Sequence, residues 1–164
     1  MAHGCRDVLI VVGHPWNAPC PWGQCAKSPQ ESIGTTQGVH AMNFPNPYPT
    51  RIPSDSSYNF SFTSNAAYFQ RATVSINGQA AAVFTGSGEN VAMTQQGGST
   101  SYGGATRQSV SASVLFEYSP DGSNYSQSSV AQAWSTSTLV LVGTEDSNDN
   151  DNNDTVMTLS FNPL

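Results

Sequence analysis

Apolar and polar residues alternate in short segments from about residue 35 onward, and this alternation constrains the fold more than any other feature. In residues 58–63, for example, polar residues separate Tyr58, Phe60 and Phe62. A period of two places every second side chain on one face of a β-strand. No stretch shows a sustained helical period, whereas β-branched and aromatic residues recur at short intervals. The pattern predicts an all-β domain and is typical of a β-sandwich.

The clearest pair of expected strands is a hairpin centred on Asn77-Gly78. Residues 72–76 alternate, Asn-Gly is a preferred pair for a type I′ turn, and residues 79–84 run back along the first strand. Further strands are expected at 110–118, 139–142 and 157–161. The segment between the last two strands should therefore be a loop that two core strands hold in place.

The length of 164 residues suffices for one domain with an appended segment. Residues 1–34 differ from the rest, because they contain all three cysteines and a proline-rich stretch from Pro15 to Pro29. We interpret residues 1–34 as an N-terminal extension and residues 35–164 as the main domain. The cysteines are Cys5, Cys20 and Cys25, and their spacing matches no common zinc site.

Charge and hydropathy argue against several classes of function. The net charge is −6 with only five Lys and Arg residues, so we expect no binding to nucleic acid or to an anionic membrane surface. The longest apolar run, Val8 to Val12, is too short to insert across a bilayer. Because a conventional secretory signal is absent, we expect a cytoplasmic protein or one exported by an unconventional route to the cell surface or extracellular space.

The most polar segment is the decapeptide from Glu145 to Asp154, which carries five of the eleven acidic residues, four side-chain amides and no cation. Like charges at this density repel one another unless a cation holds them together. Ca²⁺ suits such a segment because it takes roughly six to eight oxygen ligands. A solvated turn is the alternative, since Asp and Asn favour loops. An EF-hand would need Gly at the position of Asp154 and Glu at that of Ser160, so it is excluded.

The spacing within the decapeptide resembles the signature of the bacterial two-calcium fucose/mannose lectins, the LecB-like family. The similarity includes the preceding Leu-Val-Gly-Thr, the following strand, and the ten residues from Asp154 to the terminal Leu164. Thr36-Gln37-Gly38-Val39 resembles the start of the family's first strand, and Asn65 stands at the position of its calcium-binding asparagine. The resemblance implies an antiparallel nine-stranded β-sandwich with two Ca²⁺ ions per subunit site, assembled as a homodimer or homotetramer.

The resemblance also implies the residues of the site. The metal ligands would be Asn65, Glu145, Asp149, Asp151, Asn153, Asp154 and the C-terminal carboxylate of Leu164 from a neighbouring chain. The sugar would contact Asn65, Ala66, Ala67, Tyr68, Glu145, Asp146, Asp149, Asp151 and Asp154. Ala66 lacks the hydroxyl that a serine offers at this place in the family, so we predict a preference for mannose over fucose.

Three functions can be compared at this point. The first is a non-enzymatic, calcium-dependent lectin for mannose- or fucose-containing glycans. The second is a structural interaction protein in which calcium only stabilises the loop of a β-sandwich. The third, a calcium-dependent glycan-processing enzyme, is disfavoured because the candidate carboxylates are all assigned to metal and the sequence suggests no catalytic nucleophile–base pair.

Overall fold

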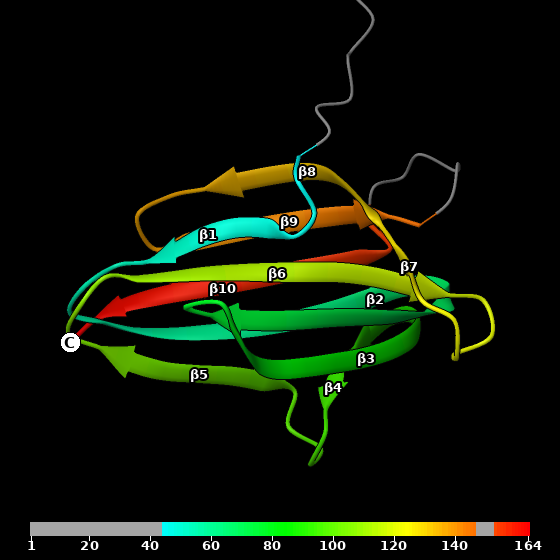
Figure 1. Ribbon diagram of the computed structural model, residues 1–164, viewed down its shortest axis with the longest axis horizontal. Coiled ribbons are helices and arrows are strands. Elements are labelled where there is room, and N and C mark those ends of the chain that lie inside the picture. The colour runs from blue at the N-terminus through cyan, green and yellow to red at the C-terminus, as the bar shows by residue number, and fades with distance from the viewer. Residues whose placement is uncertain (1–43, 147–152) are drawn as a thin grey trace, which may run out of the picture. The chain divides into compact units, whose positions relative to one another are not determined.

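The computed structural model describes residues 44–146 and 153–164. The expected N-terminal extension, residues 1–34, and the segment 36–39 lie outside the described residues. Every helix or strand in the described part is a β-strand, and the strands pair in antiparallel fashion (Figure 1). The predicted all-β class is therefore confirmed. None of the described residues forms a helix long and apolar enough to cross a membrane.

Ten strands make up the described part: β1 (Tyr48–Ile52), β2 (Ser56–Ile76), β3 (Gln79–Ala92), β4 (Thr94–Gln95), β5 (Ser101–Thr106), β6 (Val110–Ser119), β7 (Ser126–Gln127), β8 (Ser129–Ser135), β9 (Leu139–Glu145) and β10 (Thr155–Pro163). The resemblance implied nine. The structure describes one strand more, and two of its ten, β4 and β7, are only two residues long and pair with β3 and β6.

The 21-residue strand β2 takes part in both layers of the domain. Its residues 56–64 pair with β10, and β9 and β8 continue this first sheet. Its residues 69–76 pair with β6, and β1 lies beyond β6 in a second sheet. The register of β2 against β3 shifts between Ser64 and Gln70, where the strand passes from one sheet to the other. Such irregularities let a strand bend, so one continuous strand joins the two layers.

Inward-facing side chains of the two sheets form a single apolar core. Phe62 of the first sheet lies 4.7 Å from Phe84 and 6.3 Å from Phe116 of the second sheet, measured between ring centroids. Burial of each such side chain contributes roughly 1.5–3 kcal/mol, so this layer of rings holds the sheets together. The largest fully buried apolar residues are Phe60, Phe84, Phe116, Ile52, Met93, Met157 and Leu159.

The predicted hairpin is confirmed. Ile76 pairs with Gln79, and the two residues between them, Asn77 and Gly78, have φ angles of 50° and 78°. Positive φ at both central positions is the requirement of a type I′ turn. The two strands of the hairpin therefore continue as β2 and β3, and β3 extends well beyond the predicted residues 79–84.

Candidate metal centre

The inward face of the first sheet changes from apolar to polar where β9 ends and β10 begins. Ser64, Thr144 and Thr155 are register neighbours on β2, β9 and β10, and all three are buried. The Thr155 backbone N–H donates to Thr144 Oγ1 at 3.2 Å, and the Thr144 hydroxyl donates to the Thr155 carbonyl at 3.3 Å. This polar row lies at the edge of the apolar core, and Thr144 and Thr155 directly adjoin the acidic residues Glu145 and Asp154 in sequence.

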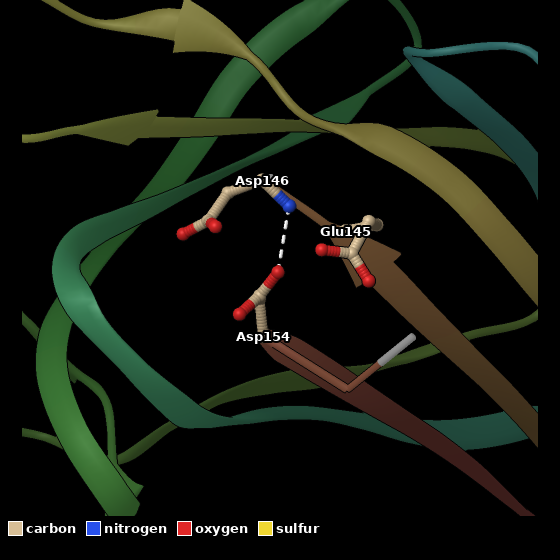
Figure 2. Close-up of side chains that lie close together, drawn as sticks. All are labelled: Glu145, Asp146 and Asp154. Carbon is tan, nitrogen blue, oxygen red and sulfur yellow. Dashed lines mark hydrogen bonds between the residues drawn. The ribbon is translucent and has the colours of Figure 1, made fainter. Parts of the chain in front are cut away.

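Three carboxyl groups meet beyond the polar row: that of Glu145 at the end of β9, that of Asp146 directly after it, and that of Asp154 before β10 (Figure 2). One oxygen of each lies within 4.8 Å of the others. The Asp146 backbone N–H donates to Asp154 Oδ2 at 2.6 Å, the bond drawn in Figure 2. Glu145 and Asp154 are only 8% and 4% exposed. Solvent therefore screens their mutual repulsion weakly.

The electrostatics of this carboxylate cluster, formed by Glu145, Asp146 and Asp154, favour an added cation. Burial raises the pKa of Asp154 to about 7, and the charges of Asp146 and Glu145 act in the same direction. The hydrogen bond from the Asp146 N–H opposes the rise but does not cancel it. A positive ion among these oxygens would lower the pKa of Asp154 and keep its carboxylate ionised.

The arginines of the described part do not supply that positive charge. There are three of them, and each contacts another group. Their partners are Glu117 for Arg71 at 2.8 Å, Asp55 for Arg107 at 3.5 Å, and the Ser109 hydroxyl for Arg51 at 2.5 Å. Within residues 44–146 and 153–164, the cluster is therefore not matched by a neighbouring arginine.

Asn65 lies beside the carboxylate cluster, although it is about eighty residues away in sequence. Its backbone N–H donates to the Asp154 carbonyl at 2.9 Å, and its Nδ2 donates to the Asn153 carbonyl at 2.8 Å. Its Oδ1 accepts a hydrogen bond from the Asn90 backbone N–H at 3.0 Å. Asn65 thus joins the bend of β2 to the residues that precede β10. The structure brings it together with Asn153 and Asp154, as the predicted site requires.

Three other predicted ligands cannot be placed in the same way. Asp149 and Asp151 lie outside the described residues. Leu164 lies at the opposite end of β10 from Asp154, where its N–H donates to the Asp55 carbonyl at 2.9 Å (Figure 1). The terminal carboxylate is therefore remote from the cluster of its own chain. Its role as a ligand to a neighbouring subunit's ions stays a prediction.

The predicted sugar-contacting segment follows Asn65 in the bend of β2. Ala66 is buried, with 6% of its surface exposed, so its methyl group offers little area to a ligand. Ala67 and Tyr68 are exposed. The Tyr68 ring stacks on Tyr118, with 6.2 Å between the centroids and 18° between the planes. Tyr118 was not among the predicted residues.

Sequence reasoning also missed Gln70, which is fully buried beside the cluster. Gln70 Nε2 donates to Asp146 Oδ2 at 2.6 Å, and Gln70 Oε1 accepts from the Thr155 hydroxyl at 2.9 Å. A signal existed in the sequence: Ala72 and Val74 mark the inward face of the strand, and Gln70 continues that alternation with a polar residue. Buried polar groups need partners, and here the partner is a carboxylate of the candidate site.

The family comparison decides what kind of protein this is. The sequence model of the PA-IIL family, described as fucose-binding lectin II, matches residues 50–163. The chain belongs to this family. The match spans both halves of the site, from the bend of β2 to the end of β10, and it confirms the predicted resemblance. No curated protein matches the chain.

Solved lectins of bacteria are similar to the chain in structure. The Chromobacterium violaceum lectin CV2L, solved with alpha-methyl-fucoside, has 19% identity and a TM-score of 0.51, covering 73% of this chain and 98% of that one. This likeness supports the PA-IIL fold. The Ralstonia solanacearum high-affinity mannose-binding lectin has 25% identity and a TM-score of 0.49, and the match covers 71% of this chain and 96% of that lectin. The C-terminal domain of the Burkholderia cenocepacia lectin BC2L-C has 20% identity and a TM-score of 0.46, and the match covers 71% of this chain and 95% of that domain.

Proposed function

We propose that the chain is a non-enzymatic, calcium-dependent lectin that binds a terminal mannose or fucose of a glycan. The observation that carries the proposal is the carboxylate cluster between the end of β9 and the start of β10, with Glu145 and Asp154 buried, in a member of the PA-IIL family. Its ligand atoms are all oxygens, which are the ligands that calcium prefers. The raised pKa of Asp154 supports the same conclusion, because burial and, to a lesser extent, the charges of Asp146 and Glu145 disfavour its ionised form when no cation is bound.

The described carboxylates fit a calcium site, and the family resemblance supports two ions. Glu145, Asp154 and Asn65 are held next to one another by the strand register, and Asp146 stands beside them. The full set would be Asn65, Glu145, Asp149, Asp151, Asn153 and Asp154, with the carboxylate of Leu164 contributed by a neighbouring copy of the chain. When bound, the ions supply open coordination positions that two neighbouring hydroxyls of a sugar can occupy in place of water.

Hydrogen bonds within the protein orient the carboxylates of the site. Gln70 fixes one Asp146 oxygen, while the Asp146 N–H fixes one Asp154 oxygen, so these carboxylates are ordered before a ligand arrives. Ordered groups lose less conformational entropy on binding. The remaining Asp146 oxygen can accept a hydrogen bond from a sugar hydroxyl.

Two finer features belong to the same proposal. The absence of a hydroxyl at Ala66 supports a preference for mannose over fucose, which isothermal titration calorimetry with the two methyl glycosides measures directly. Fucoside binding at least tenfold tighter than mannoside binding would contradict it. The use of a terminal carboxylate from another chain requires a homodimer or homotetramer, and such an oligomer would gain avidity on a surface rich in glycans.

Thermal unfolding of the purified protein tests the proposal. We expect calcium to raise the melting temperature above that in EDTA, and methyl α-mannoside or methyl α-fucoside to raise it further only when calcium is present. Methyl β-galactoside serves as the matched sugar control. Stabilisation by calcium with no response to either sugar would favour the structural alternative, and turnover of an aryl mannoside would favour an enzyme.

A further inference from the structure

A hollow of about 460 Å³ opens beside the carboxylate cluster. Glu145 and Asp146 form the wall that it shares with the cluster, and Tyr68 and Tyr118 form another wall. Pro120, Gln127 and Ser129 complete its lining. Its volume falls in the range of roughly 300–1,000 Å³ that is usual for small-molecule sites. The hollow therefore continues the proposed sugar site instead of forming a separate one.

The aromatic wall is ordered before a ligand binds. The rings of Tyr68 and Tyr118 are nearly parallel, with 18° between their planes, and both line the hollow. Tyr68 is 41% exposed although it is stacked. Tyrosine offers a large contact area at a low entropic cost because it has few rotatable bonds. An exposed, stacked tyrosine beside a binding site is suited to contact with a ligand.

The turn that borders the hollow is also fixed. Asp121 Oδ1 accepts hydrogen bonds from the Ser119 hydroxyl at 2.8 Å and from the backbone N–H groups of Ser123 and Asn124 at 2.9 and 3.0 Å. Gly122, with a φ of 75°, lies against the ring of Phe69, where an added Cβ would come within 3.2 Å. These contacts hold the turn with Pro120 against the bend of β2, which carries Tyr68.

Gln70 connects the two walls of the hollow. Its side chain binds Asp146 on one side and lies 3.5 Å from the Tyr68 carbonyl on the other. In Figure 2 the Asp146 carboxylate points toward the β2 ribbon, away from Glu145. The same buried amide thus contacts the Asp146 carboxylate and the backbone of Tyr68.

The chemistry of the walls selects the class of ligand. Among the residues that the structure describes, two carboxylates and no cationic side chain line the hollow, which disfavours anionic groups such as sialic acid or phosphate. A neutral pyranose ring has apolar C–H faces and a rim of hydroxyls, which match tyrosine rings and the polar side chains of Gln127 and Asp146. A sugar held at the cluster would place the next residue of its glycan at this opening.

We propose that the hollow is a second subsite, which binds the neutral sugar adjoining the terminal mannose or fucose, so that the recognised ligand is an oligosaccharide. This inference rests on the proposed lectin function. In this proposal Tyr118, Tyr68 and Gln127 discriminate between glycans that end in the same sugar but differ in the sugar next to it. The expected preference between a disaccharide and its terminal monosaccharide is about three- to tenfold, as for one aromatic contact.

Calorimetric titration of the calcium-loaded full chain provides the test. The ligands are methyl α-mannoside, methyl α-fucoside, the α1-2, α1-3 and α1-6 mannobiosides, and fucosyl-α1-2-galactoside. We expect the wild type and Tyr118→Phe to bind at least one disaccharide about three- to tenfold tighter than the methyl glycoside of its terminal sugar. In Tyr118→Ala the ratio of the two dissociation constants should fall to about one.

The outcomes separate the inference from the function on which it rests. Binding of a methyl glycoside with no disaccharide preference, or with a preference that Tyr118→Ala retains, would overturn the second subsite alone. Failure to bind any methyl glycoside would overturn the proposed lectin function and the subsite with it. If Tyr118→Ala does not fold, Gln127→Ala replaces it, because Gln127 is exposed and its substitution should also lower the ratio.

Discussion

The aspartates Asp121 and Asp154 both lie in loops between strands, but their surroundings differ. Asp121 is exposed, and the N–H groups of Asn124 and Ser123 together with the Ser119 hydroxyl hold its pKa well below the usual range. Its turn therefore satisfies the negative charge from within. An acidic residue of this kind needs no cation, and it matches the solvated-turn alternative that was considered for the acidic decapeptide.

Asp154 is the opposite case. It is buried beside Glu145 and Asp146, and burial is the largest cause of a pKa raised to about 7. Its hydrogen bond from the Asp146 N–H does not compensate for the lost solvation. The comparison shows that the number of acidic residues in a loop says little about metal binding. What matters is whether the backbone of the same loop satisfies their charge.

The largest expected effect comes from Asp154→Asn. Calcium should no longer raise the melting temperature, and binding of methyl α-mannoside should be lost, because a proposed calcium ligand at the centre of the carboxylate cluster is gone. In EDTA at neutral pH the variant should be at least as stable as the wild type, since a neutral amide relieves repulsion from Glu145 and Asp146. Thermal unfolding with and without calcium measures both effects. A calcium shift equal to that of the wild type would exclude Asp154 as a ligand.

A second prediction concerns pH. The pKa of Asp154 is about 7 in the folded chain, whereas the ordinary value for the unfolded chain is 3.8. Between pH 3.8 and about 7, the folded, metal-free protein therefore holds a proton that the unfolded chain has released. The stability that this proton contributes is fully present below about pH 3.8 and is lost as the pH rises through about 7. Calcium must displace the same proton, so its binding weakens as the pH falls below about 7.

The gap in melting temperature between calcium-loaded and EDTA-treated samples should therefore widen from pH 5 to pH 8. Asp154→Asn is the matched control, and it should show no gap at any of these values. A wild-type gap of equal size at pH 5 and pH 8 would mean that Asp154 does not carry a proton in competition with calcium.

The strands that carry side-chain alternation could be predicted from the sequence, and β5 shows why others could not. Gly103 and Gly104 give β5 no apolar pattern, yet it pairs with β2. A Cβ at Gly103 would collide with the carbonyl oxygen of Tyr58, so the close approach of the two backbones requires glycine there. Sequence patterns report which face a side chain occupies, and two successive glycines in the middle of a six-residue strand leave little of that signal.

The residues of the candidate site also fall into two groups, those that the sequence indicated and those that only the fold brings to the site. Glu145, Asp146 and Asp154 are close in sequence, so the density of acids indicated them, and the family resemblance added Asn65. Gln70 and Tyr118 reach the site only through the bend of β2 and its pairing with β6. No local pattern states where a long strand passes from one sheet to another. The alternation could have indicated that Gln70 points inward, but not that it meets Asp146, and no local pattern indicated Tyr118.

The smallest expected effect is that of Asp121→Ala. Because Asp121 is exposed, the loss of its hydrogen bonds should lower the melting temperature by roughly a few degrees. The calcium-induced shift should stay unchanged, since this turn carries no proposed ligand. Asp121→Asn is the control that retains an acceptor oxygen for Ser119, Ser123 and Asn124, and it should recover most of the stability. A weakened calcium response in Asp121→Ala would show that the turn supports the carboxylate cluster, and the contrast between the two aspartates would then fail.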